Sequence, residues 1–425
     1  MFKAKAADQI ADPLARCMAF PDIPRNQWPA GLARTQCELT YGPHITPNQI
    51  GQYLDRGATA ELDALFARDL ERHFSKTDFS EVIHADFNPI DASEASDQLT
   101  ERWLKMAPES AFARMARARY LRVMAGEVRG DKYVSETPRK NLRQMSEFAG
   151  QAIDLYEKAL AVEPRLMPAY GGLISAGMVD SRPEVIRSAF ERSEAIDSTC
   201  MPVTASMITA LRPEWGGDYP TMVAYAEKLY PEMQRRPLLA LVVFEPFIAK
   251  SDALYNAKRY QESMDTLLAV APKSTSPEIF EDLARAMAEV APDERRWEII
   301  MYLLEVTRFQ RPRGWAGREL GRDLVYTAAE NDWSVMVLER SVAKEPDNAM
   351  GHRLLADSYS YVQRVAEAEQ QYELAAKGPD ERPNALAALY RLAMGQKQVE
   401  KARGYYETLE KEFPDYAAKS GIVAP

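Results

Sequence analysis

The sequence repeats itself near its C-terminus after 34 positions. The recurring residues are small, aromatic or aliphatic: Leu355, Ala368, Tyr372 and Ala375 correspond to Leu389, Ala402, Tyr406 and Leu409. A period of this size is typical of helix–turn–helix units, each of which buries its apolar face only by stacking on the next unit. The repeat therefore predicts the architecture of the chain, and this architecture favours binding as the function.

The remainder of the chain has the spacing of amphipathic helices from about residue 58 onward. Leu62, Phe66 and Leu70, for example, lie on one stripe of a helix. No segment alternates apolar and polar residues as a strand does, so we expect an all-α fold. The expected helical hairpins cover residues 202–232, 237–272, 277–309, 315–345, 348–377 and 383–412.

The C-terminal hairpins carry the pattern of a known family. Small residues are placed where two helices approach, and an aromatic residue fills the gap to the next hairpin: Leu355, Ala356, Tyr359, Ala368, Tyr372, Ala375 and Pro379. Over residues 348–414 this spacing resembles the tetratricopeptide repeat. The match is weaker over 314–347, where Gly321 and Ser334 replace the expected Leu and Ala. The resemblance implies a right-handed α-solenoid of tetratricopeptide-like helical hairpins that binds protein.

Residues 60–270 resemble a second family, through anchors spread along its helices: Trp103, Pro108, Ser110, Ala113, Arg129-Gly130, Ala152, Pro168-Ala169-Tyr170 and Arg212-Pro-Glu-Trp-Gly-Gly217. That family is an uncharacterised bacterial helical domain, often encoded near genes for antibacterial secretion systems. It implies no activity or cofactor. We therefore expect an irregular N-terminal cap at 1–57, a divergent helical-repeat domain at 58–272, and tetratricopeptide-like C-terminal repeats at 273–425.

The N-terminal residues leave the compartment open. Residues 1–57 are rich in Pro, Gly and polar residues, and we expect one short helix there, near 47–55. Cys17 and Cys37 are either bridged by a disulfide, in an oxidising compartment, or reduced and buried as small apolar groups. The first residues lack the apolar core of a secretory signal. We therefore expect a cytoplasmic chain, or a periplasmic one if Met1 replaces a removed signal peptide.

Charge and hydropathy exclude two classes of partner. The chain has 53 basic and 63 acidic residues, a net charge of −10, which disfavours nucleic-acid binding. No apolar run approaches the roughly 20 residues needed to span a bilayer, so we expect no membrane insertion. Residues 60–100 have a local net charge of −7 and residues 101–143 one of +6. This polarity is either a solvated surface with paired charges or a surface that steers a charged protein partner.

No catalytic or metal-binding motif is visible in the sequence, so we expect no enzyme activity, no cofactor and no metal. The chain lacks the spacings of zinc sites, phosphate-binding loops and nucleophile elbows. The alternative is a hydrolase or metal enzyme built on the acid–imidazole group nearest in sequence, His73, His84, Asp86 and Asp91. The favoured interpretation of these aspartates is that they cap helices.

In stacked hairpins the first helix of each unit lines the concave face. The repeat register places seven mixed polar residues there: Glu319, Asp323, Tyr326, Arg353, Asp357, Asn384 and Arg391. We expect a non-catalytic protein-binding repeat protein, most concretely an immunity-type protein that binds and neutralises an antibacterial toxin or effector. The alternative is a scaffold, adaptor or assembly factor in a bacterial envelope or secretion complex. The sequence leaves the partner and the oligomeric state open.

Overall fold

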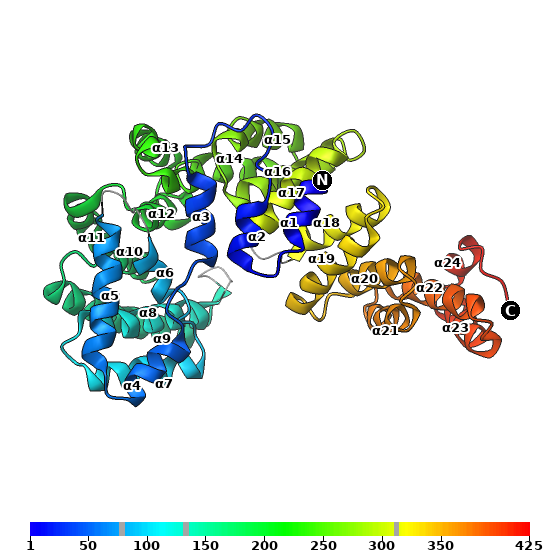
Figure 1. The fold of residues 1–425 in the computed structure, drawn as a ribbon, viewed down its shortest axis with the longest axis horizontal. Helices are drawn as coiled ribbons and strands as arrows, with labels where there is room; N and C mark the ends of the chain where they lie inside the picture. Colours follow the sequence, from blue (N-terminus) through cyan, green and yellow to red (C-terminus); the bar gives the residue numbers. More distant parts are fainter. Residues whose placement is uncertain (76–80, 131–135, 310–313) are drawn as a thin grey trace.

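The fold is an α-solenoid of consecutive antiparallel helix pairs (Figure 1). A computed structural model describes residues 1–75, 81–130, 136–309 and 314–425. Within those ranges every regular element is an α-helix or a short 3₁₀-helix, and none is a strand. None of the described helices is long and apolar enough to cross a membrane. The all-α prediction is confirmed.

The helices of the first half are α1 (Phe2–Asp8), α2 (Pro13–Ala19), α3 (Leu32–Tyr41), α4 (Pro47–Asp55), α5 (Thr59–His73), α6 (Val82–Phe87), α7 (Glu94–Met106), α8 (Ala111–Arg129), α9 (Arg139–Val162), α10 (Met167–Val179), α11 (Pro183–Asp197) and α12 (Met201–Ala210). Many begin at a side-chain cap. Ser110, for example, accepts a hydrogen bond from the backbone N–H of Ala113 at the start of α8.

The helices of the second half are α13 (Tyr219–Leu229), α14 (Glu245–Asn256), α15 (Tyr260–Leu268), α16 (Pro277–Val290), α17 (Arg296–Phe309), α18 (Gly314–Tyr326), α19 (Asn331–Lys344), α20 (Ala349–Tyr361), α21 (Val365–Ala375), α22 (Arg382–Gly395), α23 (Val399–Glu412) and α24 (Pro414–Lys419). They form the expected hairpins. One boundary differs: residues 237–244 were expected to begin an α-helix, but Pro237–Leu241 forms a short 3₁₀-helix and α14 begins at Glu245. Pro246 would interrupt the interior of a longer α-helix, whereas it is tolerated in the first turn of α14.

The N-terminal segment departs from the prediction. Residues 1–57 contain α1, α2 and α3 as well as the expected α4, and α1–α3 lie beside α16–α19 (Figure 1). Asp8 accepts hydrogen bonds from Trp333 Nε1 at 2.8 Å and Arg340 Nη1 at 2.6 Å. A disulfide joins Cys17 to Cys37, with their Cα atoms 5.7 Å apart. The segment is therefore neither irregular nor a cap at the end of the solenoid, because its apolar residues are buried against the middle of the chain.

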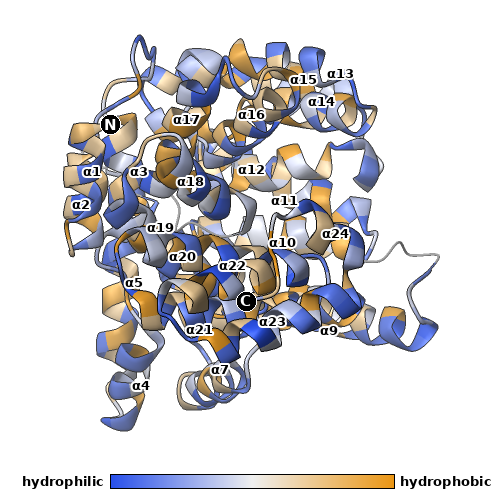
Figure 2. Cartoon of the chain, turned by 90° about the vertical axis from the view of Figure 1, so that its right-hand side faces the viewer, coloured by the Kyte–Doolittle hydropathy of each residue, from blue (hydrophilic) through white to orange (hydrophobic). Residues whose placement is uncertain are grey.

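The hydrophobic cores show how the helix pairs are joined. One core contains residues of α1–α3 together with residues between 208 and 337, and a second contains residues between 45 and 203. Smaller cores hold the C-terminal hairpins. The first core includes both Val270 and Ile279, so it crosses the expected domain boundary at residue 272. Polar and apolar residues share the same helices throughout, as stacking requires (Figure 2).

The two residues that weaken the repeat pattern at 314–347 have a packing reason. A Cβ atom added at Gly321 would lie 2.4 Å from Cγ of Leu338, so the facing helix already occupies that space. Ser334 donates a hydrogen bond to the carbonyl oxygen of Gly321 at 2.8 Å, and its hydroxyl lies 2.9 Å from that of Ser358. In this hairpin, α18 and α19 therefore approach closely through Gly321 and Ser334, at the positions where the repeat usually has Leu and Ala.

Gly321→Ala should therefore destabilise the protein by about 1–3 kcal/mol, because overpacking displaces Leu338 or the helix backbone. Gly404→Ala is the matched control: Gly404 lies inside α23 with nothing within 4 Å of its added Cβ, so alanine should stabilise by about 1 kcal/mol. Urea unfolding followed by circular dichroism measures both. A neutral Gly321→Ala would contradict the close helix packing.

A buried ion pair fastens the N-terminal segment to α17. Arg308 donates hydrogen bonds to the carbonyl oxygen of Cys17 at 3.1 Å and to Asp22 at 2.8 Å, and its Nη1 lies 3.3 Å from Glu305 Oε2. The Glu305 side chain is 4% exposed. Burial raises the pKa of Glu305 to about 7, although the Arg308 charge opposes the shift.

Because the pKa of Glu305 is higher in the folded protein than in the unfolded chain, the folded state binds more protons between about pH 4.5 and 7. The contribution of this residue to stability should therefore fall as pH rises through that window. Between pH 5 and 8, the unfolding free energy of Glu305→Gln should fall less than that of the unmodified protein, and the difference should be on the order of 1 kcal/mol. Urea titrations at both pH values test this, with the exposed Glu298→Gln in the same helix as control. Parallel pH profiles for all three proteins would contradict the assignment.

Candidate functional site

Four of the seven residues predicted on the concave face form one connected group with Glu381. Tyr326 of α18 donates to Asp357 of α20 at 2.5 Å, and Arg353 donates to Asp357 at 2.8 Å. Arg353 also donates to Glu381 at 2.6 Å, and Asn384 of α22 donates to the same carboxylate at 3.3 Å. We call these five residues the polar row. It connects the first helices of three successive hairpins.

The other predicted residues are placed differently. Glu319 and Asp323 are buried, and Asp323 Oδ1 lies 3.4 Å from Nη1 of Arg296, while Glu319 Oε2 lies 2.5 Å from Nη2 of Arg322. Burial raises the pKa of both carboxyls. Arg391 is exposed and donates to the carbonyl oxygen of Ser420 at 3.3 Å. The accessible part of the predicted face thus consists of the exposed Tyr326 and Arg391 and the partly buried Arg353, Asp357 and Asn384.

The structure divides the acid–imidazole group named in the sequence. His73 and His84 lie together, with ring centroids 5.8 Å apart. Asp86 instead accepts a hydrogen bond from the backbone N–H of Ile45 at 3.2 Å, and burial raises its pKa to about 7. Asp91 accepts from the N–H of Ser93 at 3.0 Å and from the hydroxyl of Ser96 at 2.7 Å, so it orders the turn before α7, whose N-cap is Ser93.

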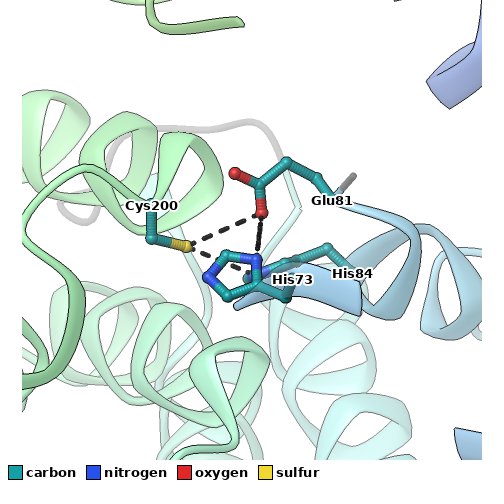
Figure 3. A group of neighbouring side chains, drawn as sticks. All are labelled: His73, Glu81, His84 and Cys200. Carbon is teal, nitrogen blue, oxygen red and sulfur yellow. Dashed lines mark hydrogen bonds and ion pairs between the residues drawn. The ribbon is translucent and has the colours of Figure 1, made fainter. Parts of the chain in front are cut away.

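Two further residues complete a cluster around the histidines: His73, Glu81, His84 and Cys200 each direct one nitrogen, oxygen or sulfur atom to a common point (Figure 3). His73 is the last residue of α5, Glu81 and His84 belong to the first turn of α6, and Cys200 precedes α12. The four atoms all lie within 4.8 Å of one another. Below, we call these four residues the His–Cys cluster.

A charged network surrounds His73 on the opposite side of its ring. Nε2 of His73 lies 3.0 Å from Oδ2 of Asp197, the last residue of α11. Arg236 donates to the same carboxylate and, through Nε, to the hydroxyl of Thr199 at 3.2 Å. The hydroxyl of Thr199 donates to Asp197 Oδ1 at 2.7 Å. These bonds fix the position of the imidazole ring.

The environment moves the pKa values in opposite directions. Burial disfavours a charged His73, but its hydrogen bond to Asp197 and the nearby Glu81 charge outweigh burial and raise its pKa to about 12. Burial lowers the pKa of His84 to about 3. Burial and the charge of Glu81 raise the pKa of the Cys200 thiol to about 12. With these groups alone, His73 is an imidazolium, His84 is neutral and Cys200 is a thiol.

Two cavities adjoin the His–Cys cluster. One has a volume of about 680 Å³ and is lined by Glu81, Arg72, Arg236 and residues of α3. The other has a volume of about 370 Å³ and is lined by Glu81, His84, Arg119, Arg122 and Tyr156. The cluster is therefore reachable from two sides, although its side chains are mostly buried.

Sequence reasoning missed Glu81 and Cys200. A signal for Glu81 was present, because Glu81-Val-Ile-His84 spaces a carboxylate and an imidazole three residues apart, which places them on one face of a helix. Cys200 is 116 residues from its contact with His84, and no local pattern marks it. Residues 60–100 are mainly acidic and residues 101–143 mainly basic, and some of these charges pair with each other. Arg117, for example, lies 2.5 Å from Asp97.

Comparisons with known proteins identify no family for this chain. No protein-family model matches the chain, and no curated protein matches it. Among solved structures it is similar to one titled "Functional Characterization of Pseudomonas Aeruginosa pilF", at 15% identity and a TM-score of 0.21. That similarity covers 66% of this chain and 95% of the other. The resemblance of residues 60–270 to the bacterial helical domain gains no support from these comparisons.

Arg236→Leu should destabilise the protein by about 3 kcal/mol, because it leaves the partly buried Asp197 carboxylate without its guanidinium partner. Arg235→Leu is a matched control in the adjacent position: Arg235 pairs with Glu232 at the surface, and its loss should cost less than about 0.5 kcal/mol. Chemical denaturation of both variants gives the comparison. Equal effects would show that the network around His73 contributes nothing specific.

Proposed function

We propose that this chain is a non-catalytic, protein-binding helical-repeat protein whose partner contacts the polar row. The observation that supports this proposal is the continuity of the row across α18, α20 and α22. Its groups hold one another in place: Tyr372 of α21, for example, donates to the second oxygen of Asp357 at 2.7 Å. A partner that meets such a surface loses less side-chain entropy on binding.

Aromatic and arginine side chains give the surface its anchors. Tyr326 is 51% exposed although its hydroxyl is fixed on Asp357, and Arg391 is exposed on α22, two hairpins further on. Tyr and Arg are enriched among the residues that dominate binding energies at protein interfaces. The mixed charges of the row favour a folded or extended protein partner over nucleic acid.

Most concretely, we propose an immunity-type protein that binds and neutralises an antibacterial effector. Support comes from the family resemblance of residues 60–270 and from the binding surface. The Cys17–Cys37 disulfide favours the periplasmic alternative, because such bonds persist in oxidising compartments. The second candidate is a scaffold or assembly factor in an envelope or secretion complex, which the same surface would serve through several weaker partners.

We infer that the chain is not an enzyme from the way the acid–imidazole residues are arranged. Asp86 and Asp91 interact elsewhere and do not orient His73 or His84. Without a bound metal ion, burial and the charge of Glu81 raise the pKa of the Cys200 thiol, whereas a nucleophilic cysteine needs a lowered pKa. Among the described residues, His73 is held between the carboxylates of Glu81 and Asp197, an arrangement that fixes the ring as an ion-pair partner.

The test is a binding titration between the full chain and the purified effector encoded beside its gene. We expect a near-stoichiometric complex, and we expect Tyr326→Ala and Arg391→Glu each to weaken it at least about tenfold. Arg403→Glu, on the second helix of the last hairpin, is the control and should bind like the unmodified chain.

Protection assays separate the two candidates. An immunity protein should rescue cells that express the effector, and the two weakened variants should rescue less well. Failure to rescue, together with several weak partners that all depend on Tyr326, would favour the scaffold. No complex at low salt with the effector, or equal losses in the control, would contradict the binding surface.

A further inference from the structure

We propose that the His–Cys cluster is a binding site for one divalent transition-metal ion of the zinc class, with His73 Nδ1, Glu81 Oε2, His84 Nε2 and Cys200 Sγ as its four ligands. The site is independent of the polar row and of the proposed function. It lies in the first half of the chain, whereas the polar row lies on α18–α22 and the adjoining turn.

The separations between the ligand atoms match a tetrahedral site. Zinc binds nitrogen and oxygen at about 2.0–2.1 Å and sulfur at about 2.3 Å, so tetrahedral ligands lie about 3.3–3.7 Å apart. Cys200 Sγ is 3.3 Å from His84 Nε2, and Glu81 Oε2 is 3.7 Å from His84 Nε2. Glu81 Oε2 is 4.0 Å from Cys200 Sγ and 2.8 Å from His73 Nδ1. All the separations are within 4.8 Å, so side-chain shifts of up to about one ångström would complete the geometry.

His73 supplies a separate argument. Its Nδ1 atom is buried and lies close to Glu81 Oε2, but not in the direction of a hydrogen bond, so it has no hydrogen-bond partner among the described residues. Its other nitrogen is held by Asp197, which Arg236 and Thr199 hold in turn. Metal-bound histidines almost always donate their second N–H to a carboxylate or carbonyl in this way, because that bond fixes the tautomer and the ring orientation.

The donor set selects the kind of ion. Two imidazoles, a carboxylate and a thiolate suit zinc and related transition metals, whereas magnesium and calcium prefer oxygen ligands alone. Four protein ligands close the coordination sphere, which is typical of structural rather than catalytic zinc. The bound ion would connect the end of α5, the start of α6 and the start of α12. The two adjoining cavities provide the entry path.

Cobalt substitution of the unmodified chain tests the proposal without any variant. The protein is treated with chelator under non-reducing conditions, which leave the Cys17–Cys37 disulfide intact, and then titrated with Co²⁺ and with Zn²⁺. We expect one ion per chain, the intense visible absorption of tetrahedral Co²⁺, a thiolate-to-metal charge-transfer band, and a melting temperature that rises with Zn²⁺. A Co²⁺ spectrum without the thiolate band, or no saturable binding, would overturn the site.

Variants then assign the ligands. Cys200→Ser should abolish the thiolate band, and His84→Gln should weaken Zn²⁺ binding at least about tenfold. His44→Gln is the matched histidine control, because His44 lies outside the cluster with its Nε2 on the carbonyl oxygen of Leu39 at 2.7 Å. It should bind like the unmodified chain. Folded Cys200→Ser protein that binds Zn²⁺ with unchanged affinity, or equal losses in His44→Gln, would refute the assignment.

Discussion

The structure depends on one constraint: a single helical hairpin leaves an apolar face that only a neighbouring hairpin can cover. The constraint accounts for the 34-residue repeat in the sequence and for the stacked hairpins from α12 to α23 in the structure. The same constraint explains the place of α1–α3, whose apolar residues join the core formed by residues 208–337. The N-terminal segment therefore adds a lateral layer to the solenoid.

Helix pairs could be predicted because their signals are local. Apolar spacing, proline at first turns and the repeat register together gave the six C-terminal hairpins within a few residues, except for the start of α14. The position of α1–α3 could not be predicted, since it rests on contacts such as Asp8 with Trp333, which are 325 residues apart. Short helices rich in proline and polar residues also carry little periodicity, and tertiary packing determines them.

The candidate sites also could be predicted where their signals are local and could not where they depend on distant contacts. The register placed Tyr326, Arg353, Asp357 and Asn384 on successive first helices, and the structure joins them through hydrogen bonds. It could not show that Glu319 and Asp323 are buried, because the arginines that pair with them include one from the preceding hairpin. The His–Cys cluster was half visible, since its histidines are close in sequence and Cys200 is not.

The charged network around His73 also connects the two large cores. Arg236 lies between α13 and α14, in the part of the chain whose apolar residues belong to the first core, while His73 lies on α5 beside the second. Their common partner is Asp197. A polar junction between apolar cores restricts sliding of one on the other, because a shift would leave a buried charge unpaired.

Finally, the packing of α1–α3 has a consequence for biosynthesis. Solenoids ordinarily fold from local contacts, so each hairpin can dock as soon as it leaves the ribosome. Here α1 finds its partners only after residue 340 has emerged, as the Asp8–Arg340 contact requires. Until then the apolar surfaces of α1–α3 and of the hairpins that receive them stay exposed. Closure of this segment is therefore a late step in folding, and it marks the nascent chain as one that chaperones would recognise.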